Sequence, residues 1–253
     1  MSSKGAFQAC TDACLGAGDS VYVTGQFVAT DTSDTDGLVV KFTAQGKLDW
    51  VRTYDAVGAW DGFRSVCKRP AGGVYVAGTS ETDGDDYDGI LVRYSGSGAP
   101  KVVVRVGASD NAYTEFYAVV RTTDGRLAVC GGHSVGAGLS SMVVASYTDA
   151  GVEKWYRTWS SASGSSSARL LAARADGGLA VAGFWGRESG VQHAMTYFVN
   201  KTGTRTARCD WVGPAPGETT PEDIAVRGSS TWVGGWCEQM ITAKDGFAMR
   251  LVP

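Results

Sequence analysis

Five copies of one short motif recur along the chain at intervals of 52 or 53 residues. Each copy is an apolar, strand-like segment that ends in a glycine, and these glycines are Gly25, Gly78, Gly131, Gly183 and Gly235. A constant interval of this length, built on short strands, is typical of an array of equivalent structural units. The spacing therefore constrains the fold more than any other feature of the sequence.

Four strand-like segments follow one another within the second repeat, at 63–67, 74–78, 89–94 and 101–106. Turn-forming residues separate them at 70–73 and 95–100, and the other repeats follow the same plan. No window shows the apolar pattern of an amphipathic helix, so we expect helix to be nearly absent.

A four-stranded sheet with two apolar faces is stable when neighbouring sheets cover both faces, which radial stacking achieves. We therefore expect an all-β fold: a single five-bladed β-propeller of four-stranded antiparallel blades, forming one domain over 1–253. Its repeats run over 7–59, 60–112, 113–164, 165–217 and 218–253. A β-solenoid is the main alternative, although its coils are usually shorter and parallel. The fifth repeat lacks a fourth strand, and we expect the N-terminal segment 1–6 to complete this blade and close the ring.

Three segments resemble the β-propeller repeats that are common in bacterial proteins: 60–66 (WDGFRSV), 71–80 (AGGVYVAGTS) and 88–94 (DGILVRY). The resemblance covers essentially the whole chain. It implies the propeller fold and no particular function. The third and fourth repeats depart from the pattern, since Ser141 and His193 stand near the positions of Asp36, Asp88 and Asp245.

The net charge is -3 and the pI is near 5.4. The chain as a whole therefore has no excess of positive charge that would favour binding to nucleic acid or to an anionic membrane. The N-terminus lacks the apolar run of a signal peptide, and no stretch approaches the ~20 apolar residues of a membrane span. The six cysteines are scattered, which favours reduced thiols and an intracellular, cytoplasmic location. A removed leader and disulfide bridges are the alternatives.

Strand direction places the longer loops on one face, where binding residues usually lie on a rigid scaffold. We expect a ligand or partner to be bound there by Trp60, Tyr113, His133, Trp185 and Trp236, with His193 nearby. Such aromatic residues stack on sugars or anchor protein partners, and packing between adjacent loops is the alternative. A sugar-binding propeller would have similar aromatic pockets between several blades. Since we find that these aromatics do not recur at one repeat position, the sequence argues mildly against sugar binding.

Two charged sets accompany these aromatics. The acidic run Glu81, Asp83, Asp85, Asp86 and Asp88 could offer oxygen ligands to calcium, but no twelfth-position glutamate follows, and a solvated acidic loop is the expected interpretation. On the opposite, short-turn face, a possible anion-attracting ring is formed by residues spaced 53 apart: Lys68, Arg121, Arg174 and Arg227. The alternative is that these turn residues simply face water.

Signals for catalysis are weak. There are two histidines, no pair with zinc-ligand spacing, no nucleophile elbow and no phosphate loop. Five-bladed glycosidases use inward carboxylates near the starts of inner strands, and the residues near such places are Asp61, Glu115 and Asp223. We therefore expect no catalytic residues, no metal and no cofactor. The leading hypothesis is a non-enzymatic scaffold that binds a protein partner, a larger assembly included; a carbohydrate-binding propeller and a glycoside hydrolase are the alternatives.

Overall fold

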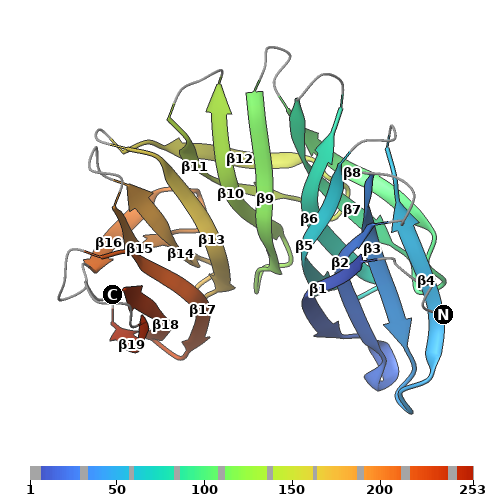
Figure 1. The fold of residues 1–253 in the computed structure, drawn as a ribbon. Coiled ribbons are helices and arrows are strands. Elements are labelled where there is room, and N and C mark those ends of the chain that lie inside the picture. The colour runs from blue at the N-terminus through green and yellow to red at the C-terminus, as the bar shows by residue number, and fades with distance from the viewer. Residues whose placement is uncertain are drawn as a thin grey trace. The chain divides into compact units, whose positions relative to one another are not determined.

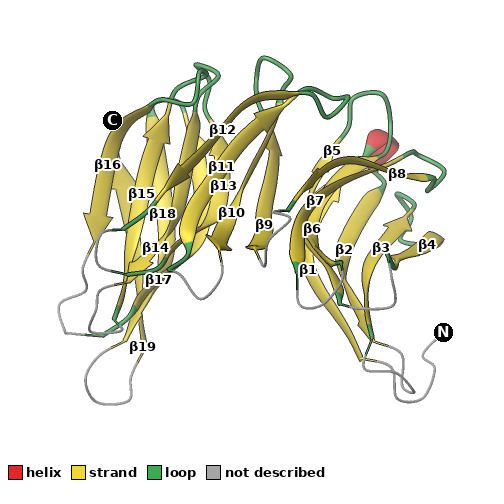
Figure 2. Cartoon of the chain, turned by 90° about the horizontal axis from the view of Figure 1, so that it is seen from above, coloured by secondary structure: helices red, strands yellow, loops and turns green. Residues whose placement is uncertain are grey.

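The computed structural model describes residues 7–28, 34–56, 60–82, 86–107, 112–135, 139–161, 164–186, 191–211, 217–238 and 244–252. These residues form two compact units, 1–119 and 120–253. Most of them lie in β-strands, and the helical element among them is a single 3-10 turn at Ala17–Asp19 (Figure 2). The all-β fold with almost no helix is therefore confirmed. None of the described helical elements is long and apolar enough to cross a membrane.

The first unit contains one antiparallel sheet of four strands and four consecutive antiparallel strands of a second sheet, which has eight strands in all (Figure 1). Their strands are β1 (Phe7–Leu15), β2 (Val21–Val28), β3 (Thr35–Phe42) and β4 (Leu48–Tyr54), then β5 (Asp61–Lys68), β6 (Val74–Glu81), β7 (Tyr87–Tyr94) and β8 (Pro100–Val106). The next strand, β9 (Ala112–Arg121), bridges β7 in parallel where Tyr87 pairs with Tyr113. Four-stranded antiparallel groups are thus present, as predicted, and at this bridge the second group joins β9, which is the first strand of the third repeat.

The second unit repeats the same antiparallel plan. Its strands are β10 (Leu127–Val135), β11 (Ser141–Tyr147) and β12 (Glu153–Trp159); β13 (Ser166–Ala173), β14 (Leu179–Gly186), β15 (Gln192–Val199) and β16 (Arg205–Trp211); and β17 (Thr219–Arg227), β18 (Ser230–Glu238) and β19 (Lys244–Leu251). The last sheet has three strands among the described residues, as the missing segment of the fifth repeat predicts. Residues 1–6, which we expected to complete it, lie outside the described residues, so the count of five closed blades stays a prediction.

The repeated glycine lies where the chain comes closest to a neighbouring strand. Gly25, Gly78, Gly183 and Gly235 each face a β-bulge in the preceding strand. A Cβ atom at any of these four positions would fall far inside van der Waals contact of a backbone carbonyl oxygen across the bulge. The sequence anchor therefore reflects a backbone contact that only glycine allows.

Burial follows the position of each strand in its sheet. The middle strands β6 and β7 of the second repeat are buried on both faces, whereas the fourth strands β4, β8, β12 and β16 contain many exposed residues. Neighbouring sheets supply the cover: β5 packs against β1, β2 and β3, and β17 packs against β13, β14 and β15. Stacked sheets hide both apolar faces, as the repeat pattern requires.

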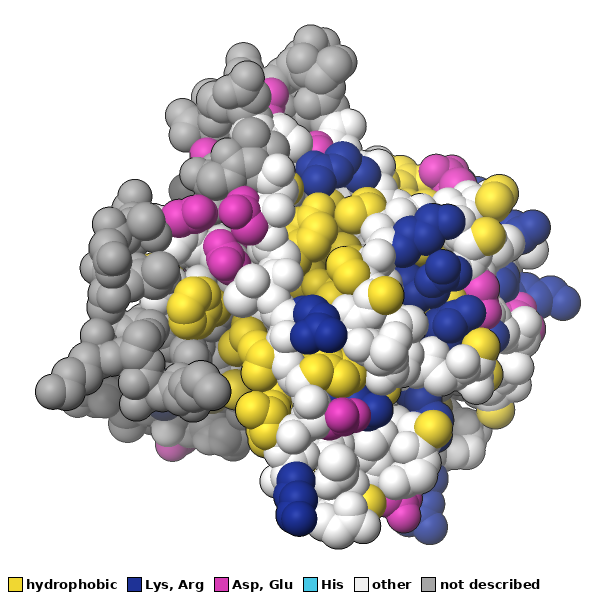
Figure 3. Space-filling model, turned by 90° about the vertical axis from the view of Figure 1, so that its right-hand side faces the viewer, with side chains coloured by type: hydrophobic (Ala, Val, Ile, Leu, Met, Phe, Trp, Pro, Cys, Tyr) yellow, Lys and Arg dark blue, Asp and Glu magenta, His cyan; other side chains and the backbone are white. Residues whose placement is uncertain are grey.

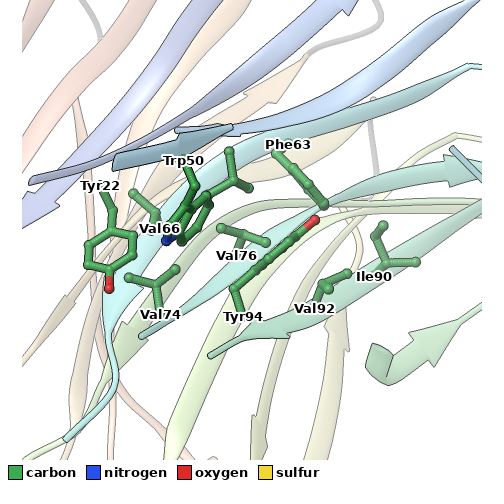
Figure 4. Packing of buried hydrophobic residues seen from close by; sticks show 10 residues of the cluster. Tyr22, Trp50, Phe63, Val66, Val74, Val76, Ile90, Val92 and Tyr94 are labelled. Carbon is green, nitrogen blue, oxygen red and sulfur yellow. The ribbon is translucent and has the colours of Figure 1, made fainter. Parts of the chain in front are cut away.

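Aromatic side chains fill the interface between the two sheets of the first unit (Figure 4). The Trp50 ring lies 5.8 Å from that of Tyr22 and 6.3 Å from that of Tyr94, and Phe63 meets Tyr94 edge to face at 6.2 Å. Valines of β5, β6 and β7 close the remaining space. No disulfide is present among the described cysteines.

The second strand of each repeat continues three or four residues past the repeated glycine, to Val28, Glu81, Val135, Gly186 and Glu238. The loops that follow are therefore shorter than the sequence predicts. Residues that we placed in loops, among them His133 and Trp185, belong to strands instead.

Candidate functional site

Three aromatic rings of the first unit form a continuous row. The ring of Tyr87 lies 4.8 Å from that of Tyr113 and 6.2 Å from that of Trp60. The backbone sets this order, because Tyr87 begins β7 and bridges Tyr113 on β9, while Trp60 directly precedes β5. The structure thus brings together two of the predicted binding residues, Trp60 and Tyr113. The residue that connects them is Tyr87, which we expected in a loop and did not select as a binding residue.

Backbone hydrogen bonds hold Trp60 in place. The Glu81 carboxylate accepts the Trp60 N–H at 2.9 Å, and the Glu81 N–H donates to the Trp60 carbonyl at 2.9 Å. The indole lies over Gly62, where a Cβ atom would stand 2.8 Å from the ring and 2.6 Å from Gln26 Nε2. The guanidinium of Arg64 lies 5.5 Å from the Trp60 ring centroid. These contacts leave the ring ordered and partly exposed.

A carboxylate completes the row on β9. Tyr113, Glu115 and Tyr117 alternate along this strand and so share one face. Both tyrosine hydroxyls donate to the Glu115 carboxylate, and the Glu115 side chain is buried. Burial, followed by the charge of Glu115, raises the pKa of Tyr113 well above its usual range, so this hydroxyl stays protonated at physiological pH. We call Trp60, Arg64, Tyr87, Tyr113, Glu115 and Tyr117 the aromatic–carboxylate cluster.

The aromatics of this cluster do recur in the repeat, contrary to our expectation. Trp60 and Tyr113 are 53 residues apart and occupy the same place before or at the start of an inner strand. Each forms a parallel β-bridge to the residue that begins the third strand of the preceding repeat: Trp60 pairs with Thr35, and Tyr113 pairs with Tyr87. The spacing of 53 was the signal that could have found this pair.

The second unit places its predicted aromatics in separate pairs. Trp185 lies opposite His193 in the β14–β15 register, with rings 5.3 Å apart, and Arg208 stands 5.5 Å from the Trp185 ring. Trp236 is held by Glu222, which accepts its indole N–H at 2.9 Å, and by Lys244 Nζ, 3.7 Å from its ring centroid.

His133 lies on β10 opposite Ser141. Within this unit, the described contacts do not join His133, Trp185 and Trp236 into one aromatic row.

The four charges predicted to form a ring make local contacts. Lys68 Nζ donates to the Gly16 carbonyl at 2.9 Å. Arg121 pairs with Asp149 at 2.5 Å, and Arg174 pairs with Asp176 at 3.1 Å. Arg227 is exposed at the end of β17. The ring itself stays a prediction, and two of its four charges are compensated by neighbouring carboxylates.

The acidic run at 81–88 is largely engaged in structural contacts. Glu81 holds Trp60, and Asp88 forms an ion pair of 2.8 Å with Arg105. The Asp86 carbonyl accepts the Thr82 N–H at 2.8 Å. Asp83 and Asp85 lie outside the described residues.

A different acidic group forms at the ends of β3 and β4. Carboxylate oxygens of Asp34, Asp36 and Asp55 lie within 4.8 Å of one another, an arrangement of described residues that could hold a hard divalent cation. Burial, then the charges of Asp34 and Asp55, raise the pKa of Asp36. On the face drawn in Figure 3, a group of acidic side chains lies toward the left, whereas Lys and Arg side chains are most numerous toward the right, with acidic ones among them.

The three carboxylates considered for glycoside hydrolysis do not share one environment. Asp61 is 1% exposed, and burial raises its pKa to about 6 although the Ser80 hydroxyl and the Ala56 N–H act in the opposite direction. Asp223 is exposed, and its Oδ1 accepts the N–H of Ile224 at 2.8 Å. By repeat spacing Asp61 corresponds to Thr114, whereas Glu115 corresponds to Gly62 on the alternate face. Asp61 and Glu115 therefore occupy different positions of the repeat.

No family model matches the chain, and no curated protein matches it. Solved structures of similar fold include a protein of unknown function from Dyadobacter fermentans, 10% identical, with a TM-score of 0.64 over 96% of this chain and 76% of that chain. A GH43 β-xylosidase/α-arabinofuranosidase from a compost microbial metagenome is 10% identical, with a TM-score of 0.52 over 97% and 91% of the two chains. Trypanosoma rangeli sialidase is 11% identical, with a TM-score of 0.55 over 91% and 46%. The last two are propellers, so these likenesses support an all-β, propeller-like fold.

Proposed function

We propose that the chain is a carbohydrate-binding β-propeller whose aromatic–carboxylate cluster contacts a sugar. The same proposal retains the five-bladed, single-domain architecture and the repeat family that the sequence resembles. The observation that carries it is the row of Trp60, Tyr87 and Tyr113 beside the buried Glu115. Aromatic faces offer an apolar surface to a pyranose ring, and a few fixed polar groups beside them orient the ligand.

Two hydrogen-bond donors border the same rings without an acceptor of their own. Gln26 Nε2 and Arg64 Nε are buried and have no hydrogen-bond partner among the described residues. Both belong to side chains that contact or border Trp60. Because both atoms are buried, a ligand does not reach them in this structure, and the partly exposed rings themselves are the surface offered to a sugar.

The fold comparisons favour the carbohydrate hypothesis over the protein scaffold. Two of the similar solved structures are named for action on sugars, the β-xylosidase/α-arabinofuranosidase and the sialidase. A scaffold role receives no support from them. We propose binding rather than hydrolysis, because Asp61 and Glu115 lie on alternate faces of equivalent strands and Asp223 is exposed.

A glycan array probed with the wild-type chain, Trp60→Ala and Tyr113→Ala tests the proposal. Trp232→Ala is the matched control, since Trp232 is 46% exposed and lies outside the cluster. We expect wild-type binding to neutral oligosaccharides and at least a tenfold loss in each cluster variant, because truncating a central aromatic anchor typically costs more than about 1.4 kcal/mol. Absence of glycan binding, or equal binding by W60A and wild type, would contradict the proposal.

A further inference from the structure

A shallow pocket of about 380 Å³ lies in the second unit, and no residue of the aromatic–carboxylate cluster lines it. Three segments line it: the turn before β10, strand β12, and the turn between β15 and β16. The residues that matter for its chemistry are Asp124, Arg126, Lys154, Trp155, Arg157 and Lys201.

Hydrogen bonds to one carbonyl fix these segments against each other. The Trp155 indole donates to the Lys201 carbonyl at 3.0 Å, and Arg126 Nη1 donates to the same oxygen at 2.7 Å. Arg126 Nη2 also reaches the Gly177 carbonyl at 3.2 Å. Gly203 lies against the indole, where a Cβ atom would stand 2.7 Å from the ring. The pocket is therefore a preformed feature of the fold.

The pocket carries an excess of positive charge. Its one carboxylate, Asp124, is paired with Arg126 at 2.8 Å, and that hydrogen-bonded pairing lowers the pKa of Asp124 to about 2. Lys154, Arg157 and Lys201 form no ion pair with any carboxylate in the described part of the chain. Three uncompensated cations thus surround one pocket of a chain whose net charge is -3.

The first unit contains the same tryptophan contact with fewer uncompensated cations: Arg52 stands in the place of Arg157, and Lys41 pairs with Asp49 at 2.8 Å. Trp50 donates to the Gly96 carbonyl at 3.1 Å, and Gly98 lies against its ring as Gly203 lies against Trp155. By repeat spacing, Asp49 stands in the place of Lys154 and Gly96 in that of Lys201. Since the packing forms equally well with an acidic residue and a glycine there, it does not explain the two lysines.

We propose that this pocket binds a multiply charged oxyanion, a phosphate or sulfate group, through Lys154, Arg157 and Lys201. A planar guanidinium and two flexible ammonium groups match the oxygens of such a group. The volume falls at the lower end of the usual range for ligand pockets, which suits a single anionic group. The shallow form admits either a free anion or an anionic group carried on a glycan chain. This site is independent of the aromatic–carboxylate cluster, which lies in the other unit.

Isothermal titration calorimetry at low salt tests the proposal with two probes, inorganic pyrophosphate and a heparin hexasaccharide. The test variant K154D/K201G carries the residues of the first unit at the equivalent positions. The control K101D/K47G makes the same total charge change at Lys101 and Lys47, two exposed lysines outside the pocket, and Lys101 lies on β8 one repeat before Lys154.

We expect wild type and K101D/K47G to bind at least one probe equally, and K154D/K201G to bind it at least tenfold more weakly, with unchanged melting temperatures. If the hexasaccharide binds more tightly, the ligand of the pocket is a sulfate group carried on a glycan chain. If pyrophosphate binds comparably, the ligand is a free phosphate. No binding of either probe by wild type, or an equal loss in K101D/K47G and K154D/K201G, would overturn the proposal.

Discussion

Replacing Asp61 with serine should stabilise the protein at neutral pH. Asp61 occupies a repeat position at which the second unit has the hydroxyl residues Ser166 and Thr219. There the hydroxyl links two sheets: Ser166 Oγ accepts the Met142 N–H at 3.2 Å and donates to the Trp159 carbonyl at 3.1 Å. Thr219 Oγ1 makes the equivalent pair of bonds in the next repeat, to Ala194 and Trp211.

An ionised carboxylate cannot donate the second of these bonds. Asp61 Oδ2 accepts the Ala56 N–H at 2.8 Å, whereas Asp61 Oδ1 is buried without a hydrogen-bond partner. Burial accordingly raises the pKa of Asp61 from its ordinary 3.8 to about 6. The folded state therefore holds this proton more tightly than the unfolded state does, and the associated stability is present at low pH and lost as pH rises through 6.

The magnitude follows from this rise in pKa. At 1.36 kcal/mol per pKa unit, the rise corresponds to about 3 kcal/mol lost between acidic and neutral pH. Since the unfolded carboxyl is already about half ionised at pH 4, we expect the free energy of unfolding of D61S, minus that of wild type, to increase by about 2.4 kcal/mol between pH 4 and pH 7. D61N keeps an acceptor for Ala56 and removes the titrating group, so it should show the same change with pH.

Urea denaturation followed by circular dichroism at pH 4, 5, 6 and 7 measures this difference. Groups that titrate in all three proteins cancel in the comparison. A difference between D61S and wild type that stays constant across this range would show that Asp61 does not titrate as its environment requires, and the reasoning would be refuted.

Two further predictions concern packing and charge in the first unit. Gly98→Ala should lower the free energy of unfolding by about 2 kcal/mol or more, because Gly98 has a φ of +86° and a Cβ atom there would stand 3.1 Å from the Trp50 ring. The control Gly46→Ala, at a φ of +75° with no atom within 4 Å of the new Cβ, should cost only about 1 kcal/mol. Equal losses of the two variants in urea denaturation would contradict this. Arg105→Leu should lower the free energy of unfolding by about 3 kcal/mol, because it leaves the buried Asp88 carboxylate unpaired. The double variant D88N/R105L removes that charge and should recover part of the loss in the same assay. A double variant less stable than R105L would count against the ion pair.

Much of the fold was predictable from the sequence because it depends on local chemistry. The strand predicted at 101–106 agrees with β8 to within one residue, since turn residues mark its start. The repeated glycines marked the second strand of each repeat, although its continuation past the glycine was missed. The backbone contact that requires glycine became visible only in the structure, because the opposing bulge lies in a different strand.

The site was predictable only in part. Trp60 and Tyr113 were selected as exposed aromatics, but Tyr87, which joins them, begins a strand that the sequence analysis started two residues later. The basic pocket was missed because Arg126, Lys154 and Lys201 lie in three separate turns and strands, and no sequence interval relates them. Conversely, Arg121 and Arg174 were selected for their even spacing, and local carboxylates compensate both.

By itself the sequence determined a repeating, four-stranded, almost helix-free chain, because strand alternation and turn residues act over a few neighbouring positions. Only the tertiary structure decided which side chains meet across strands and sheets. Repeats that share one backbone plan differ in the residues at equivalent places, such as Asp49 and Lys154, and it is the contact between distant segments that gives each place its chemistry.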